Sequence, residues 1–225
     1  AVYATSMNFT ILEISIVTFL LAVSGAIAQF PIGKISDMYD RRKVIVFSTF
    51  GAAIFSIFAI LVSRQMYLPG SLATSKTWFY IFFILFSFCS LPMFSLILAH
   101  TNDYISKDKF VAAGAGLQFA FGLGAMSGPF LCSIFMDLVG SNGFFVFLFF
   151  FHCIIGFFGI YRMKVRQSVD NPDSQFVAMP QTITPAGIEL NPTTEHIEEP
   201  YSDKVKEILE RKGVKYKKEE DEMKT

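Results

Sequence analysis

The stretch GKISDMYDRRK, residues 33–43, decides the fold, because it places six charged side chains between two long apolar runs. The 32 residues before it carry one charge, Glu13, and the 20 residues after it carry none. Charge confined in this way is typical of a short loop that joins two membrane-spanning helices, since charged groups are costly in lipid. The charged residues of the loop are Lys34, Asp37, Asp40, Arg41, Arg42 and Lys43.

The composition indicates that most of the chain lies in a membrane. Hydrophobic residues make up 52% of the sequence, 27 residues are Phe, and the mean hydropathy is +0.47. A soluble domain could not cover so much apolar surface with polar groups. Residues 1–163 carry nine Lys/Arg and six Asp/Glu, whereas residues 164–225 carry ten and thirteen. We therefore predict a membrane domain over residues 1–163 and a polar tail over residues 164–225.

Five apolar runs of the membrane domain are long enough to cross a bilayer. A hydrocarbon core about 30 Å thick requires about 20 helical residues, and only helices satisfy their own backbone groups over such a run in lipid. The sequence thus predicts an all-α integral membrane protein, with helix bends near Pro92 and Pro129. The predicted spans cover residues 14–32, 44–62, 78–99, 110–136 and 143–160.

The first span has a recognisable start. Thr10 and Glu13 have the three-residue spacing of a capping box, in which each side chain binds the backbone N–H of the other residue. This pattern gives Glu13 a structural role. A second interpretation stays open, in which Glu13 lies at the mouth of a path for solute or protons.

Basic residues gather on one side of the predicted membrane. That side holds nine Lys/Arg, and the other side holds only Arg64 and Lys76. Because Lys and Arg are retained in cytoplasmic loops, we expect the loop and the tail to be cytoplasmic and the N-terminus of the chain to be outside. The nine residues are Lys34, Arg41, Arg42, Lys43, Lys107, Lys109, Arg162, Lys164 and Arg166.

The loop resembles the signature loop of the major facilitator superfamily, Gly-x-x-x-Asp-Arg/Lys-x-Gly-Arg-Arg/Lys. Gly33, Asp37, Arg41 and Arg42 match that pattern. Met38 and Asp40 replace its usual basic residue and its usual Gly, which suits the copy of the loop between helices eight and nine. Two longer stretches, AVSGAIAQFPIGKISDMYDRR and AHTNDYISKDKFVAAGAGLQFAFGLGAMSGPF, resemble the C-terminal half of the YcaD-like bacterial branch of this superfamily.

The resemblance covers about residues 1–163 and implies a fold. The five spans would be helices eight to twelve of a twelve-helix bundle, and the first residues would be the outer end of helix seven. The chain is therefore expected to be a fragment or a truncated reading frame of a carrier. Its expected partners are the N-terminal half of that carrier and the lipid bilayer.

The resemblance also implies a cytoplasmic gate in the loop. In the family, the Asp of the loop lies by the positive N-terminal end of a helix from the opposite half. The Arg pair binds carboxylates or helix-end carbonyls nearby, and these contacts open as the two halves rock. The predicted gate residues are Gly33, Asp37, Asp40, Arg41, Arg42 and Lys43. An ordinary positively charged loop is the structural alternative.

The fourth span combines small residues with one amide. Gly lets helices approach closely in lipid, so the glycines indicate either a helix that slides and flexes or tight static packing; both interpretations stay open. Gln118 is our candidate for the substrate cavity, with an interhelical hydrogen bond as the alternative. The residues predicted to pack or flex are Gly122, Gly124, Gly128 and Pro129.

The remaining polar residues of the spans predict little chemistry. His152 is expected to be neutral and hydrogen-bonded, with a proton relay as the alternative. His100 and Asp103 end the third span, where we expect polar contacts beside the loop, because no third metal ligand accompanies them. The three cysteines lie in apolar runs and predict packing, without disulfides. No metal site is predicted.

The tail reads as a linker followed by a short helix. Five prolines lie between residues 172 and 200, which favours an extended chain. Residues 202–212 then have the cap and apolar spacing of one helix. A solubilising tail and a docking helix for a cytoplasmic partner are both compatible with this pattern.

The resemblance implies secondary active transport of a small solute by alternating access in a bacterial inner membrane. A gradient of protons or of solute would drive it, since the sequence has no nucleotide-binding loop, and no cofactor is expected. No enzymatic site is predicted, because zinc signatures and paired catalytic groups are missing from the spans. With zero net charge, nothing points to nucleic acid. The alternative is a non-transporting membrane anchor that binds a partner through its tail.

Overall fold

The computed structural model describes residues 2–7, 9–65, 72–106, 109–166 and 176–179. Regular structure in these residues is helical, and none of them lies in a strand. The helices are α1 (Val2–Ser6), α2 (Ile11–Met38), α3 (Arg41–Gln65), α4 (Leu72–Ser90), α5 (Met93–Asn102), α6 (Phe110–Val139) and α7 (Gly143–Val165). The helix predicted for residues 202–212 lies outside the described residues.

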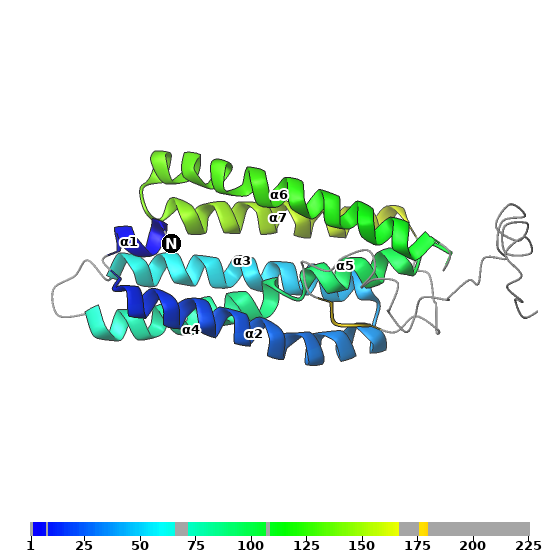
Figure 1. Cartoon of the computed structure of the whole chain (residues 1–225), viewed down its shortest axis with the longest axis horizontal. Helices are drawn as coiled ribbons and strands as arrows, with labels where there is room; N and C mark the ends of the chain where they lie inside the picture. The colour runs from blue at the N-terminus through cyan, green and yellow to red at the C-terminus, as the bar shows by residue number, and fades with distance from the viewer. Residues whose placement is uncertain (1, 8, 66–71, 107–108, 167–175, 180–225) are drawn as a thin grey trace, which may run out of the picture. The chain divides into compact units, whose positions relative to one another are not determined.

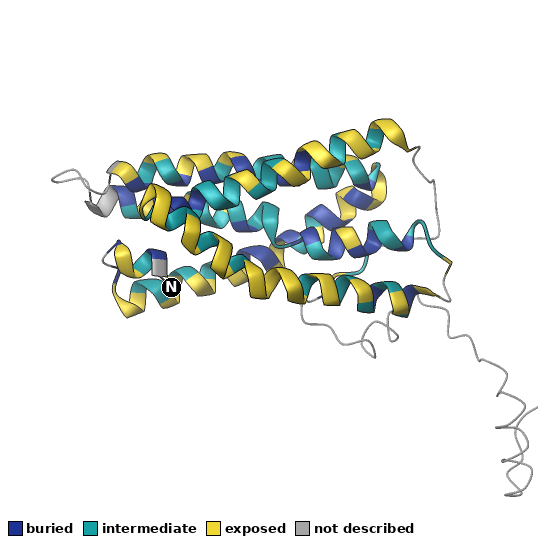
Figure 2. Cartoon of the chain, turned by 90° about the horizontal axis from the view of Figure 1, so that it is seen from above, coloured by how far each residue is buried: buried dark blue, intermediate teal, exposed yellow. Residues whose placement is uncertain are grey.

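The prediction of an all-α membrane protein with five spans is confirmed. Within the described residues, five helical segments are long and apolar enough to cross a membrane. Large apolar side chains are exposed on them, including Phe30 at 80% and Phe47 at 83%. Exposed residues cover the outward faces of the helices in Figure 2, where lipid would replace water. The segments are Ile11–Met38, Arg41–Arg64, Ser75–Asn102, Phe110–Val139 and Gly143–Val165.

Helix α3 is the central element of the bundle. It packs against α4 on one side and against α7 on the other, and α6 runs beside α7 (Figure 1). Its packed faces carry small residues, with Ala52, Ser56 and Ala59 fully buried. Small side chains let helix backbones approach closely, which is the main packing gain available in lipid.

The third predicted span breaks into two helices at Leu91 and Pro92. Helix α4 ends at Ser90 and α5 begins at Met93. A break forms here because Pro lacks a backbone N–H and its ring collides with the preceding turn. Leu91 packs against Gly25 of α2, where a Cβ atom would lie only 2.7 Å from Leu91 Cβ. The predicted bend is therefore a two-residue turn between α4 and α5, and α2 approaches it closely.

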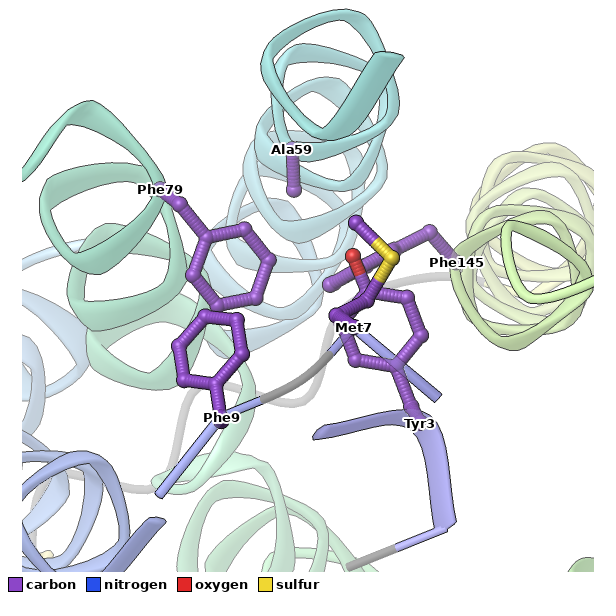
Figure 3. Close-up of a cluster of buried hydrophobic side chains, with 6 residues drawn as sticks. All are labelled: Tyr3, Met7, Phe9, Ala59, Phe79 and Phe145. Atoms are coloured by element: carbon purple, nitrogen blue, oxygen red, sulfur yellow. The ribbon is translucent and has the colours of Figure 1, made fainter. Parts of the chain in front are cut away.

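An aromatic cluster closes one end of the bundle (Figure 3). Tyr3 packs against Phe79 of α4 and Phe145 of α7, with ring centroids 5.8 and 4.9 Å away. Phe9 packs on Phe79, and Met7 and Ala59 complete the cluster. The cluster thereby attaches α1 to three other helices.

The predicted capping box at Thr10 and Glu13 is confirmed at the same end. The Thr10 N–H donates to Glu13 Oε2 at 2.8 Å, and the Glu13 N–H donates to Thr10 Oγ1 at 3.3 Å. Lys76 of α4 adds an ion pair to Glu13 Oε1 at 2.6 Å. Glu13 thus has a structural role: it caps α2 and ties that helix to α4. We call this end of the bundle the Glu13 end, and the opposite end, which holds residues 33–43, the Asp37 end.

The turn between α6 and α7 requires glycine at two positions. Gly140 has φ of 78°, a left-handed conformation that other residues rarely adopt. At Gly143, a Cβ atom would collide with the carbonyl group of Phe135 and would lie 2.6 Å from the Met136 nitrogen. Because these atoms belong to the backbone of α6, they cannot rotate away. The close approach of α6 and α7 therefore depends on Gly143.

We predict that Gly143→Ala lowers the free energy of unfolding by about 1–3 kcal/mol, the usual cost of overpacking. Gly116→Ala is the matched control, because a Cβ atom at Gly116 would meet nothing within 4 Å. At this helical position alanine stabilises by up to about 1 kcal/mol. The midpoint of thermal unfolding in detergent micelles measures both effects. Equal midpoints for the two variants would contradict the packing at Gly143.

Candidate functional site

Charged residues from several helix ends meet at the Asp37 end of the bundle. The C-terminal ends of α2, α5 and α7 lie there beside the N-terminal end of α3. Their side chains form ion pairs and hydrogen bonds with one another, which link segments far apart in the sequence. We call this set the Asp37 network; it consists of Asp37, Asp40, Arg41, Arg42 and Asp103.

Arg41 is the centre of the Asp37 network. Its Nη2 atom donates to Asp37 Oδ1 at 2.8 Å, and its Nη1 atom lies 3.3 Å from Asp103 Oδ1. The Arg41 side chain is only 7% exposed, and that of Asp103 is 11% exposed. A buried cation is tolerated only when it is paired, because desolvation of an ion costs several kcal/mol. The guanidinium therefore joins the last turn of α2 to the C-terminal end of α5.

Asp40 and Arg42 form the second ion pair of the network. The Asp40 carboxylate caps α3, since its Oδ1 atom accepts the Arg42 N–H at 3.0 Å. The same carboxylate binds the Arg42 guanidinium, with Nη2 2.7 Å from Oδ2. Arg42 Nη1 also donates to the carbonyl oxygen of Arg166 at 2.6 Å, which attaches the end of α7. Asp40 therefore has a cap function that the Gly of the signature pattern could not supply.

The other predicted gate residues differ in their surroundings. Gly33 packs directly beneath the ring of Phe176, which leaves no room for a Cβ atom. The Phe176 N–H donates to Asp37 Oδ1 at 2.8 Å. Lys43 is exposed, and its backbone N–H bonds the Asp40 carbonyl in the first turn of α3.

The predicted packing residues of α6 face open space within the described chain. A Cβ atom at Gly122, Gly124 or Gly128 would meet nothing within 4 Å. Pro129 lies inside a helix that continues to Val139. Their predicted role in packing or flexing stays a prediction.

A cavity of about 530 Å³ lies between α2, α6 and α7 near the Glu13 end. Most of its lining is apolar, and the hydroxyls of Thr18 and Ser133 donate to carbonyls of their own helices. Gly128 and Pro129 contribute to the lining, whereas the predicted cavity residue Gln118 does not. Gln118 Oε1 is buried and has no hydrogen-bond partner among the described residues. A volume of this size suits a small-molecule ligand.

His152 is held in a fixed hydrogen-bonding arrangement. Its Nδ1 atom lies 2.7 Å from the Leu148 carbonyl, and its Nε2 atom lies 3.0 Å from the Ser90 hydroxyl. A carbonyl only accepts, so Nδ1 carries a proton, and a neutral ring then accepts from Ser90 at Nε2. This geometry confirms the expected hydrogen bonds of His152 and is compatible with a neutral ring. Within the described part of the chain, no group of three His, Cys, Asp or Glu residues could hold a metal ion.

Sequence reasoning missed two partners of the Asp37 network. The resemblance led us to expect a helix-end carbonyl as a partner of the Arg pair, but not that Arg166 supplies it, because any residue at the end of α7 has a carbonyl. Phe176 belongs to the tail, which was expected to be a linker. Asp103 was expected to contact the loop region, and the structure adds the atom that it pairs with, Arg41 Nη1.

Comparisons with known proteins agree with this architecture. An uncharacterized MFS-type transporter of Yersinia enterocolitica is 28% identical over 160 residues, which is 71% of this chain and 37% of the relative. One of Methanocaldococcus jannaschii is 26% identical over 181 residues, 78% of this chain and 42% of the relative. The chain thus spans about two fifths of the length of these curated relatives. No solved structure matches it.

A family model covers most of the chain. The model of the Major Facilitator Superfamily matches residues 1–206, which include every helix of the bundle and the entire Asp37 network. This match agrees with the signature pattern of residues 33–43 and with the five apolar helices. The chain therefore belongs to the Major Facilitator Superfamily.

Proposed function

We propose that this chain forms the C-terminal bundle of a secondary carrier that moves a small solute by alternating access. Its family supports a role in membrane transport in general. The proposal extends this role to the complete carrier, of which the chain would supply helices eight to twelve. An N-terminal half would supply the second bundle, and the two bundles would rock about the solute.

The buried ion pairs of Arg41 are the observation that carries the proposal. They hold the ends of α2, α3 and α5 together at the Asp37 end. Asp37 is 35% exposed, so its carboxylate is still accessible to a donor from outside the bundle. The positive N-terminal end of a helix in the other half is such a donor. In the proposed carrier this contact is a latch, which forms when the Asp37 end closes and breaks when it opens.

The proposed orientation places the Asp37 end in the cytoplasm. The basic residues of the loop, together with Lys107, Lys109 and the end of α7, favour this side. The Glu13 end then faces outward, in a bacterial inner membrane. A latch at the cytoplasmic face would control access of the solute from inside the cell.

We propose that the cavity near the Glu13 end is part of the solute path and that its lining residues form one wall of that path. Its lining is largely apolar, which suits a solute with an apolar part. A proton or solute gradient is the proposed driving force. The alternative function, a membrane anchor that binds a partner through residues 202–212, depends on a segment outside the described residues. No described contact favours that alternative.

We predict that reporter fusions place residues 33–43 inside the cell. Alkaline phosphatase is active only outside the cytoplasm, so a fusion after Lys43 is expected to be inactive and a fusion after Arg64 to be active. Green fluorescent protein at the same two positions gives the complementary signal. The opposite pattern would overturn the orientation and the cytoplasmic latch together.

We predict that Asp37→Asn lowers transport at least about tenfold, because the latch loses a charge-assisted hydrogen bond. Uptake of isotope-labelled small metabolites by cells that express the complete carrier identifies the solute and measures the flux. Asp137→Asn is the matched control, since Asp137 is an exposed carboxylate of α6 near the Glu13 end. Membrane insertion is expected to be unchanged in both variants. Normal flux in Asp37→Asn, with a solute that the parent carrier transports, would remove the latch.

We predict that Arg41→Ala lowers the free energy of unfolding by about 3 kcal/mol, because two carboxylates lose their buried partner. Arg64→Ala serves as control; this exposed arginine lies in the last turn of α3, and its loss changes stability by no more than about 0.5 kcal/mol. Denaturant titration in detergent micelles measures both values without knowledge of the solute. A similar small effect of both substitutions would show that Arg41 does not organise the helix ends.

A further inference from the structure

Four residues that follow α7 in the chain lie between α2 and α5 at the Asp37 end. This segment, Phe176–Met179, is drawn in gold in Figure 1 and contacts both helices. It belongs to the part of the sequence whose prolines predicted a linker. We call it the strap, and its contacts show how the chain recognises it.

Ser95 of α5 binds one end of the strap. Its hydroxyl donates to the Met179 carbonyl oxygen at 2.9 Å and accepts the Met179 N–H at 3.1 Å. Met179 is 4% exposed and Ser95 is 2% exposed, so both lie away from solvent. A single hydroxyl therefore satisfies the two backbone groups of a buried residue, which would otherwise be costly to bury.

Gly33 and Asp37 of α2 bind the other end of the strap. The ring of Phe176 lies directly against Gly33, in a space that any other side chain at this position would fill. The ring also packs on a buried apolar cluster of α2 and α5 that includes Ile32 and Leu96. The Phe176 N–H donates to Asp37 Oδ1 at 2.8 Å. Backbone and side chain of Phe176 are thus both recognised.

The strap and Arg41 hold the same carboxylate oxygen. Asp37 Oδ1 accepts from Arg41 Nη2 and from the Phe176 N–H, each at 2.8 Å. Among the residues that the structure describes, none donates to Asp37 Oδ2. Two donors on one oxygen restrain the orientation of the side chain, and within the described residues the second oxygen can accept a further donor. Preorganisation of this kind strengthens a later contact, because the side chain has no rotamer freedom left to lose.

We propose that the surface between α2 and α5 is a peptide-binding site whose ligand is the chain's own segment Phe176–Met179, and that the bound segment positions Asp37 for the latch. The second part rests on the proposed function, since the latch role of Asp37 is itself proposed. Phe176 is then a positioning residue for Asp37. The tail then contributes to the gate through the four residues of the strap, which bind between α2 and α5.

Cysteine labelling tests whether the strap is bound. Cys89, Cys132 and Cys153 are first replaced by Ala, and single cysteines are introduced as Ala178→Cys and Met179→Cys. Residue 178 is exposed and residue 179 is buried, so the two neighbours form a matched pair. In lipid nanodiscs, a polar maleimide is expected to label position 178 at least about tenfold faster, since labelling of position 179 requires the strap to open. Equal rates would overturn the proposal.

Substitutions at the contacts test what holds the strap. Phe176→Pro removes both the N–H that donates to Asp37 and the ring that packs on Gly33. Ser95→Ala removes both bonds to Met179. Each substitution is expected to accelerate labelling at position 179 by at least about tenfold. Phe176→Tyr keeps the N–H and the ring and should preserve protection. Ser127→Ala is the control for Ser95→Ala, because Ser127 is exposed and bonds only the carbonyl of Leu123. Unchanged protection in Phe176→Pro and Ser95→Ala would refute the contacts proposed to hold the strap.

Measurements of transport distinguish the proposed role of the strap from that of the latch. In the complete carrier, Phe176→Pro is expected to lower flux of the identified solute by about tenfold. Phe176→Tyr is expected to keep the flux of the parent carrier. If Phe176→Pro exposes position 179 while flux stays normal and Asp37→Asn abolishes flux, the positioning role is overturned and the latch stands. If position 179 is protected and Asp37→Asn transports normally, the latch fails and with it the positioning role, whereas the peptide-binding site stands.

Discussion

The Asp37 end of the bundle depends on the burial of one cation, Arg41. A guanidinium that is 7% exposed must be neutralised, and the structure does this with Asp37 from α2 and Asp103 from the end of α5. Because the cost of an unpaired buried charge is several kcal/mol, the three helix ends can separate only if water or other charges replace these partners. The ion pairs therefore couple the positions of the three helix ends, as the proposed latch requires.

The two ends of the bundle are held by different forces. At the Glu13 end, the aromatic rings of Tyr3, Phe79 and Phe145 pack with centroid distances of 4.9–5.8 Å. Such contacts tolerate small shifts, because dispersion has little directionality. The Glu13–Lys76 ion pair adds one charged contact there, whereas at the Asp37 end several ion pairs join the helix ends. This difference is consistent with the proposed latch, in which the Glu13 end keeps the helices together and contacts at the Asp37 end form and break.

The sequence predicted those features that depend on local pattern. Span length and hydropathy predicted five membrane helices, and the spacing of Thr10 and Glu13 predicted a capping box that the structure confirms. The contact between Asp37 and Phe176 could not be predicted, because these residues lie 139 positions apart and no pattern encodes their register. Pro92 predicted a bend, whereas the close contact of Leu91 with Gly25 at this turn could not be predicted from a local pattern.

The turn at Leu91 and Pro92 divides one membrane-spanning segment into two helices, α4 and α5. Helix α4 shares the aromatic cluster, whereas α5 carries Asp103 and Ser95 at the charged end. In a continuous helix, a tilt of one end would be transmitted to the other end. Two helices joined by a two-residue turn need not tilt together. Near this joint, the Ser90 hydroxyl is fastened to His152 of α7. A tilt of α5 would therefore not require α4 to leave the aromatic cluster.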